Sequence, residues 1–126
     1  MNSEGVRARA SGAQMDIELR GQGKAKVVKL RGKLSLGDSV DRLRETLNDL
    51  MDNGDCCIVL DLGEVPMVDS SGIGLLVKSL TNAKQRGGAL RLLNPSRFVL
   101  QTLKMIGLLN LFEIFEDQEQ AVGSFR

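Results

Sequence analysis

The sequence predicts a single α/β domain with a mixed β-sheet of about five strands, repeating βα units and about four helices. Its 126 residues fit one domain, and 42% hydrophobic with 26% charged residues is typical of a globular chain. Apolar residues recur with a period of two in the first segments and at helical spacing later. Strand-like and helix-like segments then alternate, and right-handed βα crossovers make successive strands parallel.

The N-terminal third predicts a tail followed by a β-hairpin. Residues 1–13 show no apolar periodicity and are expected to be a flexible tail, so the domain covers residues 14–126. Residues 15–19 alternate apolar and polar side chains, and residues 25–30 form a second strand. Gly21-Gln22-Gly23 supplies the turn between them, which favours antiparallel pairing.

The first helix and a central strand follow. Five apolar residues at helical spacing predict the buried face of the helix: Leu36, Val40, Leu43, Leu47 and Leu50. Ser35 or Asp38 can cap its start, and Asn53-Gly54 should end it. The continuous apolar run 56–62 suits a strand covered on both faces. Its adjacent Cys56 and Cys57 would point to opposite faces, so they are interpreted as small buried side chains rather than a disulfide or metal site.

The C-terminal half predicts three further helices and two strands. The second helix follows Asp69 and has this buried stripe: Ile73, Leu76, Val77, Leu80 and Ala83. Gly87-Gly88 ends it, and residues 89–93 form a strand. Asn94-Pro95 should open a third helix as N-cap and first residue, with Val99, Leu103 and Ile106 facing inward. A short strand around residues 112–114 and a terminal helix capped by Asp117 complete the chain.

Composition excludes several classes of function. The chain has no His, which removes Ser-His-Asp and Cys-His catalysis and most zinc sites. A net charge of +1 gives no electrostatic basis for direct nucleic-acid binding. No apolar run approaches the ~20 residues of a membrane span, and the N-terminus lacks the apolar segment of a signal peptide. We therefore expect a cytoplasmic protein without membrane insertion, metal or cofactor, which is not an enzyme.

The segment Val68–Gly74 contains two serines where a strand gives way to a helix. A nucleophilic serine needs a base, and neither His nor Lys is present in the segment. The G-x-S-x-G pattern of a nucleophile elbow is absent. The phosphate-binding motifs G-x-x-x-x-G-K-[ST] and G-x-G-x-x-G are absent as well. Two interpretations remain open from the residues alone. Ser70 or Ser71 can be a helix cap, or one of them can accept a phosphoryl group that the helix dipole tolerates and a docking partner does not.

The sequence resembles a known family from about Met15 to the C-terminus. Residues 59–62 followed by 68–76 are similar to the signature of STAS-domain anti-sigma factor antagonists, and residues 30–34 resemble the end of that family's second strand. The resemblance implies a single STAS-like domain over residues 14–126. It also implies that the unphosphorylated protein binds an anti-sigma factor, itself a serine kinase, and so releases a sigma factor. Phosphorylation of Ser70 would switch it off, and a PP2C-type phosphatase would restore it.

The resemblance also implies roles for residues around Ser70. Asp69 would shape the loop or contact the partner, and Ser71, Gly72 and Ile73 would form a docking surface. The family carries an acidic residue after the Gly-x-Leu that precedes the first helix. This chain has Ser35 there, and Asp38 follows one turn later as a substitute for kinase docking. The alternative is a non-phosphorylated STAS interaction subunit of a transporter or signalling scaffold. The oligomeric state is not predicted.

Overall fold

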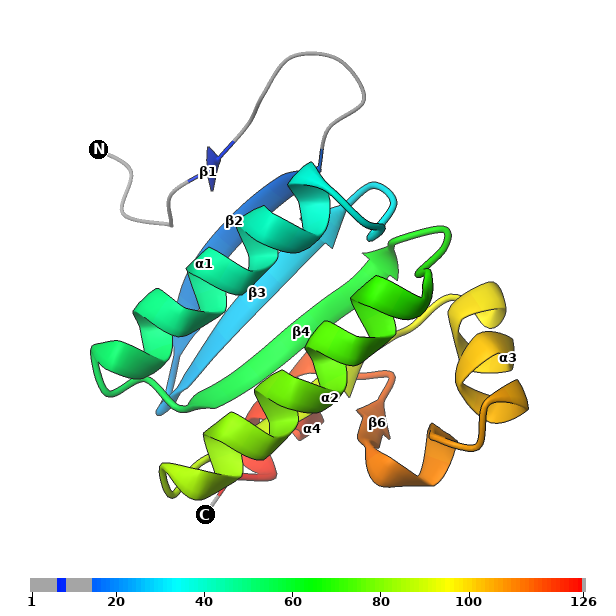
Figure 1. Ribbon diagram of the computed structural model, residues 1–126. Coiled ribbons are helices and arrows are strands. Elements are labelled where there is room, and N and C mark those ends of the chain that lie inside the picture. Colours follow the sequence, from blue (N-terminus) through cyan, green and yellow to red (C-terminus); the bar gives the residue numbers. More distant parts are fainter. Residues whose placement is uncertain (1–6, 9–14, 126) are drawn as a thin grey trace.

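The structure, a computed structural model, describes residues 7–8 and 15–125 (Figure 1). Its sheet has the strand order β1-β2-β3-β4-β5-β6. The strands are β1 (Arg7–Ala8), β2 (Asp16–Gln22), β3 (Ala25–Arg31), β4 (Cys57–Glu64), β5 (Ala89–Leu93) and β6 (Glu113–Phe115). Pairing is antiparallel from β1 to β3 and parallel from β3 to β6. The predicted mixed sheet is therefore confirmed, with β1 as an additional two-residue strand. The rest of the expected tail lies outside the described residues.

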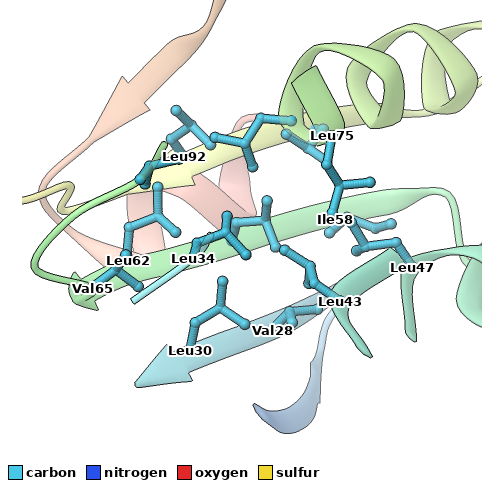
Figure 2. Packing of buried hydrophobic residues seen from close by; sticks show 14 of the residues in the cluster. Val28, Leu30, Leu34, Leu43, Leu47, Ile58, Leu62, Val65, Leu75 and Leu92 are labelled. Carbon is cyan, nitrogen blue, oxygen red and sulfur yellow. The ribbon is translucent and has the colours of Figure 1, made fainter. Parts of the chain in front are cut away.

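Helices cover the sheet on both faces. They are α1 (Asp38–Asp52), α2 (Ser70–Gln85), α3 (Arg97–Met105), the short 3-10 helix η1 (Leu109–Leu111) and α4 (Gln118–Gly123). Helices α1 and α2 lie side by side on one face, as Figure 1 shows. Figure 2 shows how Leu43, Leu47 and Leu75 of these helices point toward sheet residues such as Ile58 and Leu92. Helix α4 packs on the opposite face, where Ala121 contacts a smaller apolar cluster.

The start of α1 differs from the prediction. Its N-cap is Gly37, at φ 112°, and no side chain of the described residues caps it. The Ser39 hydroxyl accepts a hydrogen bond from the Ser35 N–H and donates to the Ser35 carbonyl (both 2.9 Å), which closes the turn before the helix. Leu36 consequently lies outside the helix with 78% of its surface exposed. The predictions that Ser35 or Asp38 caps α1 and that Leu36 is buried are wrong.

Helix α3 also begins later than predicted. Ser96 is its N-cap and accepts a hydrogen bond from the Val99 N–H at 3.3 Å. Asn94 has φ 53° and belongs to the turn after β5. Ile106 is the C-cap and is 50% exposed, so its predicted inward orientation is wrong, whereas Val99 and Leu103 are buried.

The other element predictions are confirmed with small changes. Gly21 and Gln22 are part of β2 rather than of the turn, which lies at Gly23-Lys24. The Asp117 side chain caps α4 through the Gln120 N–H at 3.0 Å. Four of the five predicted apolar residues of α2 are buried, and Val77 is half-buried. Cys56 and Cys57 are free thiols. Both are half-buried rather than buried, because Cys56 precedes β4 and Cys57 begins it, at the end of the sheet.

The contrast between Leu43 and Leu36 gives a stability prediction. Leu43→Ala should lower the free energy of unfolding by about 2–5 kcal/mol, because a fully buried side chain leaves a cavity. Leu36→Ala should change the free energy of unfolding by no more than about 0.5 kcal/mol, since most of the Leu36 side chain is exposed to solvent. Urea denaturation of both variants measures this difference, and an equal loss for both would contradict the observed start of α1.

Candidate functional site

The predicted serine segment lies at the end of the molecule where β3 and β4 finish and α1 and α2 begin (Figure 1). Ser70 is the first residue of α2. It is exposed, and Ser71 is half-buried. Within the described part of the chain, the Ser70 hydroxyl forms no hydrogen bond. Ser70 is therefore the more accessible hydroxyl of the pair.

The Asp69 carboxylate holds this end of the protein together. As N-cap of α2, it accepts a hydrogen bond from the Gly72 N–H through Oδ1 and from the Leu36 N–H through Oδ2, both at 2.9 Å. These backbone donors, Leu36 first and then Gly72, hold the pKa of Asp69 below its ordinary value of 3.8. Asp69 thus links the start of α2 to the loop before α1, and its role toward a partner stays a prediction. The interpretation of either serine as the helix cap is wrong, because Asp69 occupies that position.

Backbone hydrogen bonds continue the parallel pairing beyond β3 and β4. The Leu34 N–H donates to the Met67 carbonyl, and the Asp69 N–H donates to the Leu34 carbonyl, both at 3.1 Å. Leu34 also forms a parallel bridge with Val68. Its side chain is fully buried beside Leu62 and Val65, as Figure 2 shows. The two loops before α1 and α2 therefore form one unit anchored in the core.

Gly72 and Ile73 are buried in the first turn of α2. A Cβ atom on Gly72 would lie 2.6 Å from Val68 Cγ1 and 2.8 Å from the Leu34 carbonyl oxygen. Gly72 thus packs the helix start against the neighbouring loop, and Ile73 belongs to the core. The role of both residues in docking stays a prediction. Gly74, by contrast, is exposed and a Cβ there would meet nothing within 4 Å.

The residues predicted for kinase docking are close to the same end. Ser35 is half-buried and bonded to Ser39 through its backbone. Asp38 is exposed in the first turn of α1, and one carboxylate oxygen lies 3.8 Å from Arg42 Nη1. Asp38 thus offers a partly paired negative charge, whereas Ser35 offers none.

Sequence reasoning missed a groove beside the serines. It has a volume of about 290 Å³ and is lined by Leu36, Val40, Arg44, Ser71, Gly74, Leu75 and Lys78. The helical spacing placed Leu36 in the core, although Gly37 directly after it could have indicated that the helix begins later.

The described residues contain neither a membrane-spanning helix nor a metal-binding cluster. No helix among residues 15–125 is long and apolar enough to cross a membrane. In the same part of the chain, no three His, Cys, Asp or Glu side chains cluster as a metal site would require.

Fold and site together define a small α/β domain that presents a serine at the start of a helix capped by the preceding aspartate. The family model for the STAS domain matches residues 16–121. The chain therefore belongs to the STAS domain family, which confirms the resemblance noted in the sequence.

The curated relatives match almost from end to end. An anti-sigma-B factor antagonist of Staphylococcus aureus is 30% identical over 105 residues, which are 83% of this chain and 96% of the relative. An anti-sigma F factor antagonist of Paenibacillus polymyxa is 27% identical over 109 residues, covering 86% and 92% of the two chains.

Solved structures show the same fold. The Bacillus cell fate determinant SpoIIAA in its phosphorylated form superposes with a TM-score of 0.68 at 23% identity, over 85% of this chain and 96% of that one. A sulfate transporter family protein from Wolinella succinogenes has a TM-score of 0.68 at 21% identity, over 79% of this chain and 83% of that one. The fold alone is thus compatible with more than one role.

Gly72 and Gly74 form a matched pair for testing the packing. Gly72→Ala should destabilise the protein by about 1–3 kcal/mol, because the new methyl group would overlap the Leu34 backbone. Gly74→Ala has open space and should stabilise α2 by roughly 0.5–1 kcal/mol. Thermal unfolding of the two variants measures the sign of each change in stability. A stabilised Gly72→Ala protein would contradict this packing.

Asp69 gives a pH prediction. Its folded pKa is lowered, so its stabilising effect is present above the unfolded value and is lost as pH falls through the folded pKa. Asp69→Asn keeps a capping oxygen and removes the charge. The wild type should be the more stable protein at pH 7, and the difference should shrink steadily below about pH 4. Urea denaturation across this range measures it. A difference that does not change with pH would show that the charge of Asp69 contributes nothing.

Proposed function

We propose that the protein is an anti-sigma factor antagonist controlled by phosphorylation of Ser70. In its unphosphorylated state it binds an anti-sigma factor that is also a serine kinase, and so releases the sigma factor. The kinase phosphorylates Ser70 and the complex dissociates, and a PP2C-type phosphatase restores the binding state. The observation that carries the proposal is the exposed, unbonded Ser70 hydroxyl at the first position of α2.

The position of Ser70 suits a phosphoryl acceptor. A phosphate there adds about −1.5 to −2 charge at neutral pH, and the N-terminus of a helix favours negative charge. The helix start is fixed independently by Asp69, by the buried Gly72 and by the Leu34 backbone. The modification therefore changes the charge of the surface and leaves the fold as it is.

Loss of binding follows from that change of charge. A partner that covers Ser70 must remove water from the phosphate or place it beside its own charges, which costs several kcal/mol when no compensating group is present. Each ~1.4 kcal/mol lowers the affinity about tenfold. The names of the curated relatives support the antagonist role, and the phosphorylated form of SpoIIAA supports a phosphoprotein of this fold.

A second candidate is a non-phosphorylated interaction subunit of a transporter or scaffold. The structural likeness to a sulfate transporter family protein favours it. The two candidates differ in the partner, since capture from the native cell should recover either an anti-sigma factor kinase or membrane transport subunits.

Phosphorylation of Ser70 can be tested directly. The purified protein, incubated with ATP and the captured anti-sigma factor kinase, should gain one phosphate, and Ser70→Ala should gain none. Ser71→Ala is the matched control and should still gain one phosphate, because it keeps the exposed Ser70 hydroxyl. Mass spectrometry of the intact protein and of its peptides measures both.

The expected loss of kinase binding after phosphorylation needs a second measurement. Ser70→Asp should bind the kinase at least about tenfold more weakly than Ser70→Ala, because it adds negative charge at the docking surface. Phosphate found only on Ser71 would refute the residue assignment. A protein that no captured kinase modifies would refute the switching mechanism.

A further inference from the structure

We propose that the groove between α1 and α2 binds an acidic, apolar segment of the anti-sigma factor. An apolar side chain of that partner would enter the groove, and a carboxylate next to it would pair with Lys78 and Arg44. This inference rests on the proposed function, because it gives the chemistry of the partner at the same surface.

The apolar part of the argument begins with Leu36. This leucine is 78% exposed, and its N–H is bonded to the Asp69 carboxylate, so its backbone is held at the edge of the groove. Val40 and Leu75 supply further apolar surface inside it. An exposed leucine gains free energy when another apolar side chain covers it. A side chain of the partner that enters the groove would remove this leucine from water.

The charges of the groove give the second part. Among the described residues, its lining contains two cations, Arg44 and Lys78, and no carboxylate. Arg44 is paired with Asp41 at 2.8 Å, whereas Lys78 forms no ion pair within residues 15–125. A cation beside an apolar groove favours a partner with the opposite charge, and removal of water on docking strengthens that attraction.

The loop before α1 adds one further positive charge, on Lys33. Ser35 carries no charge, and Lys33, two residues earlier, is exposed. Lys33 also lacks an ion-pair partner in the described part of the chain. Lys33 and Lys78 are therefore two exposed cations without an ion-pair partner among the described residues, which fits an acidic partner segment.

The groove also explains how phosphorylation could release this partner. Ser71, Gly74 and Lys78 are spaced along one side of α2 and line the groove, and Ser70 precedes them directly. A phosphate on Ser70 would lie at the end of the groove and repel the carboxylate bound there. Dissociation then needs no change in the fold.

The chemistry of the groove can be measured on the protein alone. Titration with 4-phenylbutyrate, an apolar carboxylate, should shift the NMR amide signals of Leu36, Gly74 and Lys78 and reach saturation. The uncharged 4-phenylbutyramide should bind more weakly. Lys78→Glu should abolish the preference for the acid, and Lys84→Glu, on the exposed last turn of α2, should keep it. Absence of shifts around the groove, or a preference for the acid that persists unchanged in Lys78→Glu, would overturn the inference.

The partner can be tested in parallel by isothermal titration calorimetry with the captured kinase. Lys78→Glu and Leu36→Ser should each weaken binding about tenfold or more. Lys84→Glu and Met105→Ser should leave the affinity unchanged, since both residues are exposed outside the groove. A kinase that phosphorylates Ser70 and binds Lys78→Glu like the wild type would overturn the inference and leave the proposed function standing. A kinase that never modifies Ser70 would overturn the proposed function and the named partner. The titration with 4-phenylbutyrate would still test whether the groove binds an apolar carboxylate.

Discussion

One carboxylate joins the two loops that form the candidate site. The Asp69 side chain accepts from Gly72 in its own helix and from Leu36 in the loop before α1. Each bond satisfies a backbone donor that would otherwise need water, and a charged acceptor makes such bonds stronger than neutral ones. Because both bonds use the same group, the start of α2 and the position of Leu36 depend on each other. The exposed features around Ser70 therefore have a common structural origin.

The parallel pairing of β3 and β4 brings these two loops together. Both strands end at the same edge of the sheet, and Leu34 continues the pairing by hydrogen bonds to Met67 and Asp69. The buried Leu34 side chain then anchors this extension in the core that Figure 2 shows. Gly72 is required where α2 passes the Leu34 backbone, since a Cβ would come within 2.8 Å of its carbonyl oxygen. Packing alone thus accounts for one of the two glycines beside the serines.

The sequence predicted the strands and the helical faces well because periodicity reports burial directly. It failed at helix starts, where several side chains can form the same hydrogen bond and only the folded loop decides between them. Asp38 and Asn94 looked like suitable caps, but Gly37 and Ser96 hold those positions. For the same reason the exposure of Leu36 was not predicted, because this residue fits the helical spacing and yet lies before the helix. The groove depends on two helices that are distant in sequence, so no local pattern could reveal it.

The rigidity of this end of the molecule limits how a phosphate on Ser70 could act. Asp69 is held ionised by backbone donors, so the new charge would stand beside a fixed negative charge rather than replace one. The Gly72 N–H is already bonded to Asp69, and the first turn is packed against Leu34. A loop that could rearrange would bury or neutralise the phosphate and so weaken its effect on a partner. A fixed helix start would leave the phosphate at the surface, where its charge would act on the proposed docking partner at full strength.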